Sequence, residues 1–289
     1  HIYLKLGHWR KSHEANIDAI ADDERYIAGS ENAGNYAAVY YPHNVHFVVA
    51  NAQLGGDGAT ARLMSDKLDK MVSLDPETPA PFGEHIAVSP IFTALQFGDE
   101  DAVLSRPEPS GAHLFSRAVW RYARGSVFAA RGDIDRAANE LDALIALNDA
   151  DGLKDYEAFG VPLPGVIKVA ELTLEGRMLA ADGDMTGAIA ALDAAADMQE
   201  QLSYMEPTWW YYPTRQTLGA YLLMDGQADR AEREFYRTLI KSPNNAYALY
   251  GLAEAHKAQG DARSEVYARH LFRKAWIGSP GQTPELSEL

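Results

Sequence analysis

The segment from Tyr212 to Asn245 carries two amphipathic helical patterns, one on each side of Asp225-Gly226, a dipeptide that ends helices and forms turns. Apolar residues recur four positions apart in each pattern and so share one helix face. These residues are Leu218 and Leu222 before the turn, and Ala231 and Phe235 after it. The segment therefore predicts a helix, a turn and a second helix. A unit of 34 residues cannot bury such faces alone, so packed neighbouring units are expected.

The turn glycine of this unit has counterparts along the whole chain, each followed by another apolar-periodic segment. These glycines are Gly7, Gly56, Gly98, Gly132, Gly183, Gly226 and Gly260. Successive spacings are 49, 42 and 34 residues and then 51, 43 and 34, which suggests a three-unit block copied once. Spacings above 34 place insertions at about 22–41, 150–165 and 203–212. Such insertions tend to lie along one edge of a repeat array and often carry its binding function.

The best-defined unit resembles a tetratricopeptide repeat (TPR). The residues that carry the resemblance, at the small, large, turn and proline positions of that family, are Gly219, Leu222, Gly226, Ala231, Phe235 and Pro243. The resemblance covers nearly the whole chain and is most specific in the last four units. It implies an all-α, right-handed superhelical solenoid of about seven TPR-like helix-turn-helix repeats. Residues 1–289 would form this single solenoid, with 281–289 as a frayed tail.

The first unit is incomplete, because His1 opens directly onto the residues that precede its turn glycine. We therefore expect the chain to be a fragment of a longer protein. In that case the solenoid could be an architectural segment, with the active part of the protein upstream of it.

Composition limits the classes of partner. A net charge of −15 argues against nucleic acid or an anionic membrane surface as the main partner. The absence of cysteine excludes disulfides, thiolate metal sites and thiol nucleophiles. No apolar run approaches membrane-spanning length, and no secretory signal is visible. We expect a soluble protein, with a cytoplasmic location favoured over secretion and the oligomeric state undetermined.

The resemblance also implies which side chains face the concave groove. In this family, four positions of the first helix of each repeat point inward. The groove-binding candidates at those positions are His43, His46, His85, Tyr122, Arg177, Gln216, Tyr247, Tyr250 and Glu254. We expect a protein or peptide segment to bind along them.

Three of the groove candidates are histidines of two adjacent repeats. His43 and His46 are three residues apart, a spacing that can chelate a metal ion or bind an acidic group. His85 could supply a third ligand. The simpler interpretation is that these histidines form hydrogen bonds to loop carbonyls and carboxylates, because a histidine pair alone is a weak metal signal.

The densest aromatic run of the chain lies just before the best-defined repeat. Trp209, Trp210 and Tyr211 could form an aromatic wall for a peptide or an apolar ligand. Alternatively, these rings fill the core between repeats and close a helix entrance.

Catalytic signatures are missing from the sequence. It has no GxSxG elbow, HExxH helix, phosphate-binding glycine loop or dinucleotide fingerprint. We therefore favour a scaffold that binds a peptide or protein partner and needs no cofactor. The alternative is a metal-dependent enzyme or ligand sensor that uses His43, His46 and His85.

Overall fold

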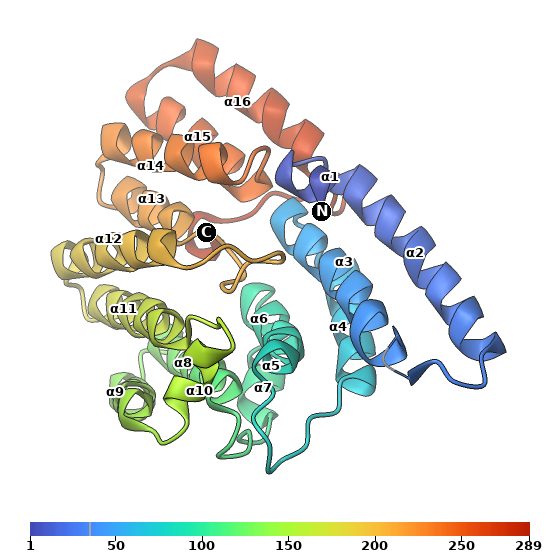
Figure 1. The fold of residues 1–289 in the computed structure, drawn as a ribbon. Helices are drawn as coiled ribbons and strands as arrows, with labels where there is room; N and C mark the ends of the chain where they lie inside the picture. Colours follow the sequence, from blue (N-terminus) through green and yellow to red (C-terminus); the bar gives the residue numbers. More distant parts are fainter. Residues whose placement is uncertain (35) are drawn as a thin grey trace.

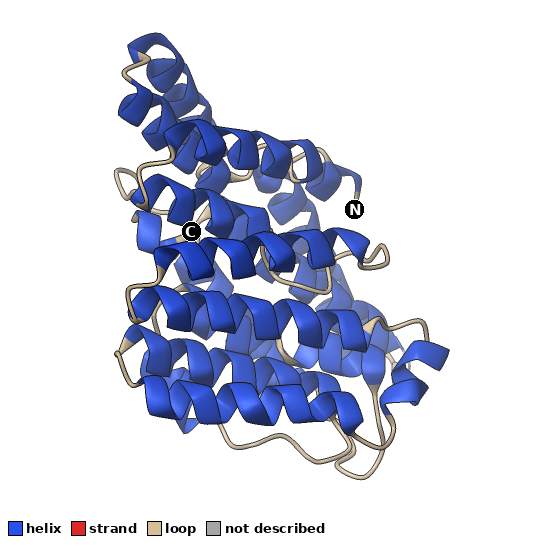
Figure 2. Ribbon diagram, turned by 90° about the vertical axis from the view of Figure 1, so that its left-hand side faces the viewer, coloured by secondary structure: helices blue, strands red, loops and turns tan. Residues whose placement is uncertain are grey.

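A computed structural model describes residues 1–34 and 36–289 of the chain. Within those ranges the chain is all helical and contains no strand, as Figure 2 shows. The all-α prediction is therefore confirmed. None of the described helices combines the length and the apolar character needed to cross a membrane.

Most helices pack against the next helix along the chain (Figure 1). The α-helices are α1 (Ile2–Lys5), α2 (Trp9–Gly29), α3 (Tyr41–Gly55), α4 (Gly58–Met71), α5 (Pro81–Ala87), α6 (Ser89–Gln96), α7 (Glu100–Ser105), α8 (Leu114–Ala130), α9 (Ile134–Ile145), α10 (Leu153–Ala158), α11 (Leu163–Ala181), α12 (Met185–Gln201), α13 (Thr214–Met224), α14 (Ala228–Lys241), α15 (Ala246–Gln259) and α16 (Ala262–Ala275). Short π- or 3₁₀-helical turns are η1 (Tyr36–Tyr40), η2 (Ala146–Asp149) and η3 (Leu286–Glu288).

The glycine turns have a local physical cause. All the predicted turn glycines, from Gly7 to Gly260, have a positive φ of 67° to 88°, a conformation that ends helices and favours glycine. In most of these turns an aspartate follows and caps the next helix. The capping carboxylates, which accept a hydrogen bond from the backbone N–H three residues on, belong to Asp57, Asp99, Asp133, Asp184 and Asp261. The Gly-Asp pairs thus stop one helix and start the next.

Packing within the best-defined pair depends on small residues facing a large ring. The Phe235 side chain of α14 is fully buried between α13 and α15. A Cβ atom on Gly219 would lie 2.8 Å from this ring, and one on Gly251 would lie 2.2 Å from it. Glycine at these two positions therefore lets three helices pack around one aromatic side chain.

Two of the expected insertions differ from the prediction. The helix that begins at Trp9 runs to Gly29, so the first insertion is shorter than 22–41; Asn35 within it lies outside the described residues. The second insertion contains the short helix α10. Residues 202–213, which we call the joining segment because they connect α12 to α13, contain no helix.

The two ends of the helix stack come together, with α3 packed against α15 (Figure 1). The indole Nε1 of Trp9 donates a hydrogen bond to the Asn244 carbonyl at 2.7 Å. The backbone N–H of Ile277 donates to the Gly55 carbonyl at 2.9 Å. The curved stack of helices therefore closes on itself, with the joining segment inside it.

The C-terminal residues also differ from the expectation of a frayed tail. Leu289 is 4% exposed, and its carbonyl accepts a hydrogen bond from the Thr217 hydroxyl at 2.6 Å. Pro284 is buried as well, whereas residues 281–283 are exposed. A leucine side chain has an apolar surface to bury, and the inner face of α13 offers one.

Candidate functional site

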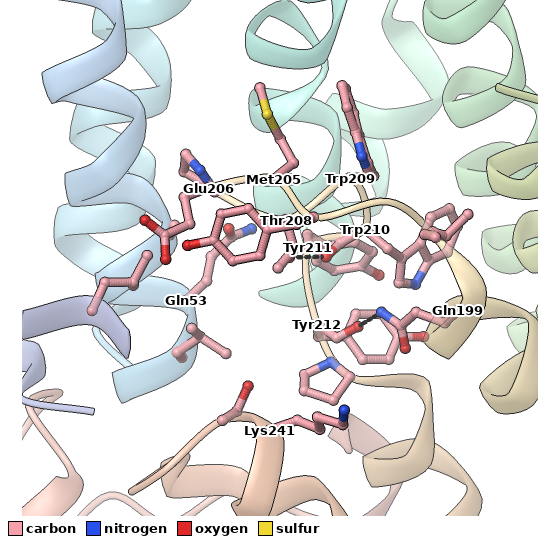
Figure 3. Close-up of a pocket in the computed structure, with 18 of the residues that line it drawn as sticks. Gln53, Gln199, Met205, Glu206, Thr208, Trp209, Trp210, Tyr211, Tyr212 and Lys241 are labelled. Carbon is pink, nitrogen blue, oxygen red and sulfur yellow. Dashed lines mark hydrogen bonds between the residues drawn. The ribbon is translucent and has the colours of Figure 1, made fainter. Parts of the chain in front are cut away.

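A cavity of about 260 Å³ lies between α1–α3 on one side and α12–α14 on the other (Figure 3). The joining segment forms one wall of it. Apolar side chains supply most of the lining, among them Leu4, Trp9, Leu54 and Met205. Helices that are far apart in the sequence contribute to its walls, so the curvature of the helix stack brings them together.

Positive charge gathers at the edge of this cavity. Lys5 of α1 lines it, 3.6 Å from Glu206, and Arg237 of α14 lines it, 3.4 Å from Glu234. Lys241 of α14 lines it without an ion-pair partner among the described residues. In the view of Figure 3, Lys241 lies across the cavity from Met205 and Trp209. An apolar interior with a cationic edge suits a ligand that has an apolar body and an acidic group.

A carboxylate fixes the joining segment to α1. Glu206 is buried, and one of its oxygens lies 2.6 Å from the His1 imidazole. Its other oxygen lies 3.6 Å from Lys5 Nζ. This contact holds the wall of the cavity against the first helix.

Two of the predicted histidines meet at the cavity. The rings of His46 and His85 lie edge to face with centroids 5.1 Å apart, and both line the cavity. The His85 Nε2–H donates a hydrogen bond to the Thr208 carbonyl at 3.0 Å. Burial lowers the pKa of His85 to about 4 and holds the pKa of His46 well below its usual range. Both imidazoles are therefore neutral near pH 7.

The third histidine points elsewhere. His43 packs on the ring of His1, with centroids 5.3 Å apart, and does not line this cavity. Three residues correspond to about 300° of helix rotation, so the two α3 imidazoles diverge by about 60°. Within residues 1–34 and 36–289, no group of three histidine, aspartate or glutamate side chains could hold a metal ion. The structure therefore does not bring the predicted histidine trio together.

The aromatic run fills the core, as the simpler interpretation had it. Trp209 is 3% exposed and Trp210 1% exposed. The Trp210 ring packs on Tyr122 at 4.8 Å, and the Tyr211 ring stacks on Phe92 at 4.1 Å. These rings still border the cavity, but most of each is covered by helices α5, α6 and α8.

The groove candidates near the end of the chain lie away from this cavity. Tyr247 packs on Trp276 at 5.8 Å, and Tyr250 packs on Phe272 at 5.6 Å. Glu254 forms an ion pair with Arg269 at 2.7 Å. These contacts tie α15 to α16 and to the residues after it.

The remaining candidates lie on the other side of the joining segment. A second cavity of about 180 Å³ is lined by Arg177, Gln216 and Tyr211. Tyr122 is fully buried beside it, with its hydroxyl 3.3 Å from the Tyr212 hydroxyl. Tyr211 and Tyr212 thus separate the two cavities and border both.

The sequence alone did not predict the cationic residues that line the first cavity. The most buried of these is Arg215, which is 4% exposed and lines the first cavity. A signal existed, because Asp193, Asp197 and Glu200 recur at helical spacing and form an acidic stripe on α12. Lys5 and Lys241 had no such signal, since they meet only where the chain closes on itself.

Comparison with protein-family models finds no match, and comparison with curated proteins finds no significant match. The function of the cavity therefore has to be inferred from its geometry. That geometry is a largely apolar volume, walled by the non-helical joining segment and bordered by charged side chains that include Lys241.

Proposed function

We propose that this protein is a TPR-like solenoid that binds an extended peptide of a partner protein, with one large apolar side chain of that peptide in the 260 Å³ cavity. The observation that carries the proposal is the joining segment. It is a non-helical stretch that lies inside the curved stack and buries two tryptophans between helices. The inner face of these helices therefore has the chemistry to hold an extended chain with aromatic anchors.

The cavity is large enough for one anchor side chain of a peptide but small for a larger ligand. Ligand pockets usually measure about 300–1,000 Å³, and this one falls just below that range. It fits one aromatic or large aliphatic side chain. Leu4, Trp9 and Leu54 would contact that side chain.

The cations that border the cavity favour an acidic residue next to the apolar anchor of the bound peptide. Arg237 and Lys241 border the cavity on α14, one turn apart. An aspartate or glutamate beside the anchor would meet these cations. We therefore propose a motif in which an apolar anchor is followed or preceded by an acidic residue.

The proposal is tested with a displayed peptide library and a variant that fills the cavity. Ala50 lines the cavity from α3, so Ala50→Phe should occupy the anchor's volume. Ala59→Phe, on the exposed face of α4, is the matched control. The wild type and the control should enrich peptides with an apolar residue next to an acidic one. For Ala50→Phe, affinity for these peptides should fall about 10- to 100-fold, which corresponds to burial of one large side chain.

Thermal unfolding of each variant checks that the helices remain intact. If no peptide is enriched by the wild type, or if Ala50→Phe binds the enriched peptides as tightly as the control does, the cavity is not a peptide site. A Lys241→Glu variant that prefers basic peptides would independently support the assignment of the acidic neighbour.

A further inference from the structure

The second cavity, of about 180 Å³, lies on the opposite side of the joining segment from the proposed peptide site. The end of α6 forms one wall, and Arg177 of α11 and Gln216 of α13 form another. Ser287 and Leu289 close it from the tail. Its lining is more polar than that of the first cavity, which points to a different kind of ligand.

Arg177 is a cation that no aspartate or glutamate of the described residues pairs with, in a cavity that the main-chain oxygen of Leu289 also lines. Within the part of the chain that the structure describes, its guanidinium forms no ion pair, and its one side-chain hydrogen bond runs from Nη2 to the Tyr212 hydroxyl at 3.4 Å. Its Nε–H is buried and has no hydrogen-bond partner. The Tyr122 ring contributes a cation–π contact at 6.0 Å. The side chain is partly buried, and a charge removed from water without an ion-pair partner is unfavourable, so this guanidinium is available to bind an anion.

Three phenols lie around Arg177, and their hydroxyls can donate hydrogen bonds. Burial raises the pKa of Tyr122 and of Tyr211, so both phenols stay protonated at neutral pH. Burial acts on Tyr212 in the same direction, yet the adjacent Arg177 guanidinium lowers the pKa of this phenol below its ordinary value. The positive potential of Arg177 at the Tyr212 oxygen therefore outweighs the effect of burial on the pKa of this phenol.

An amide completes the set of donors. Gln216 is buried, and its Nε2 donates a long hydrogen bond of 3.4 Å to the Leu289 carbonyl. Its Oε1 has no partner within the described residues. This side chain can therefore turn its amide toward a ligand without losing a strong contact.

We propose that this cavity binds a small oxyanion, a carboxylate or phosphate group, on the guanidinium of Arg177. The planar fork of an arginine matches two oxygens of such a group. The Tyr212 hydroxyl accepts from Arg177 and keeps its own proton for the anion. The Gln216 amide supplies a further donor from the facing helix.

The experiment uses the full chain in a chloride buffer free of phosphate and carboxylates. Inorganic phosphate and succinate are titrated separately by calorimetry, and the unfolding temperature is recorded with each anion and with sodium chloride of equal ionic strength. Arg177→Met removes the charge, and Arg230→Met, an exposed arginine of α14, is the matched control.

The wild type and Arg230→Met should bind one anion per chain and unfold at a higher temperature when it is present. Arg177→Met should show no binding heat, and its unfolding temperature should respond only to the general effect of salt. Binding of phosphate alone, of succinate alone or of both supports the proposal and tells which oxyanion the site prefers.

A purely structural arginine would give the opposite pattern. Arg177→Met would then unfold at a lower temperature in the anion-free buffer, and neither anion would bind the wild type. Either an absence of wild-type binding or equal binding by Arg177→Met overturns the proposal. If Arg177→Met does not fold, Arg177→Lys keeps the charge and should bind about tenfold more weakly, because an ammonium cannot form the paired contact.

Discussion

Arg215 and Arg177 lie on α13 and α11, on either side of α12, and the protein surrounds them in opposite ways. Arg215 is almost fully buried and forms ion pairs with Glu200, with Asp197 at 2.6 Å and with Glu234 at 2.9 Å. A further carboxylate, that of Asp193, lies 3.9 Å away. Arg177 is surrounded by tyrosine hydroxyls and an amide, and no aspartate or glutamate of the described residues forms an ion pair with it.

Arg215 therefore stabilises the fold, whereas Arg177 is available to a ligand. The carboxylates around Arg215 come from α12 and α14, so the ion pairs hold three helices together. These carboxylates raise the pKa of Arg215 even though burial opposes the charge. Arg177 has no such role in joining helices, and it faces a cavity instead. The predictions below test this contrast, from the largest effect to the smallest.

Removal of the Arg215 guanidinium should cost the most stability. Arg215→Met leaves several carboxylates close together without a cation, so we expect a loss of about 3–5 kcal/mol in the free energy of unfolding. Urea denaturation measures it. Arg230→Met, which removes an exposed guanidinium from α14, should change stability by less than about 0.5 kcal/mol. Equal values for the two variants would show that the Arg215 cluster is not structural.

Deletion of residues 282–289 should have the next largest effect. It exposes the surface that Leu289 covers and removes the hydrogen bond from Thr217, for a loss of about 2–4 kcal/mol. It also opens one wall of the Arg177 cavity, so anion binding should weaken. A free energy of unfolding equal to that of the full chain would mean that the tail is frayed in solution, as the repeat pattern alone predicts.

Unlike the two arginines, the buried histidines His46 and His85 are uncharged in the folded protein. His85 is neutral in the folded protein, and its pKa of about 4 lies below the ordinary value of 6.5. As the pH falls through 6.5, the unfolded chain binds a proton that the folded protein excludes, so stability decreases. Between pH 6.5 and about pH 5 the loss should reach about 2 kcal/mol. It is measured by urea denaturation across this range.

His85→Gln is the control for this pH dependence. Glutamine can still donate to the Thr208 carbonyl but does not titrate, so the slope of stability with pH should become smaller. Part of the slope should remain, because burial also holds the pKa of His46 low. An unchanged slope would show that His85 is accessible to protons in the folded protein.

Arg177→Met should have the smallest effect and the opposite sign to Arg215→Met. Without an anion, removal of an uncompensated cation should leave stability unchanged or raise it by about 1 kcal/mol. Urea denaturation in the anion-free buffer measures this. A loss as large as that of Arg215→Met would remove the contrast between the two arginines.

The elements of the fold were largely readable from the sequence, because their signals are local. The predicted turn glycines adopt a positive φ, and the aspartates that follow most of them cap the next helix. The apolar pattern around Ala231 and Phe235 places both side chains in the core. Helix ends were less accurate: α2 extends to Gly29 because no proline or glycine interrupts it earlier.

The candidate site was only partly readable. His46 and His85 meet, and Tyr122, Arg177 and Gln216 gather around the second cavity or beside it. The placement of other residues in the site depends on how the stack of helices curves and closes. Lys5 and Lys241 are 236 positions apart in the sequence but line the same cavity, so no local pattern could pair them.

By itself, the sequence determined the all-α class, the order of helices and turns, and the apolar faces that pack, because each depends on residues within a few positions of one another. The tertiary structure decided that the two ends of the helix stack meet, that the joining segment lies inside the stack and that Leu289 docks on α13. It also decided that Arg215, and not Arg177, forms ion pairs with carboxylates among the described residues. These outcomes depend on the summed rotation of many helix pairs and on the path of the inserted segments, so they are fixed only when the whole chain has packed.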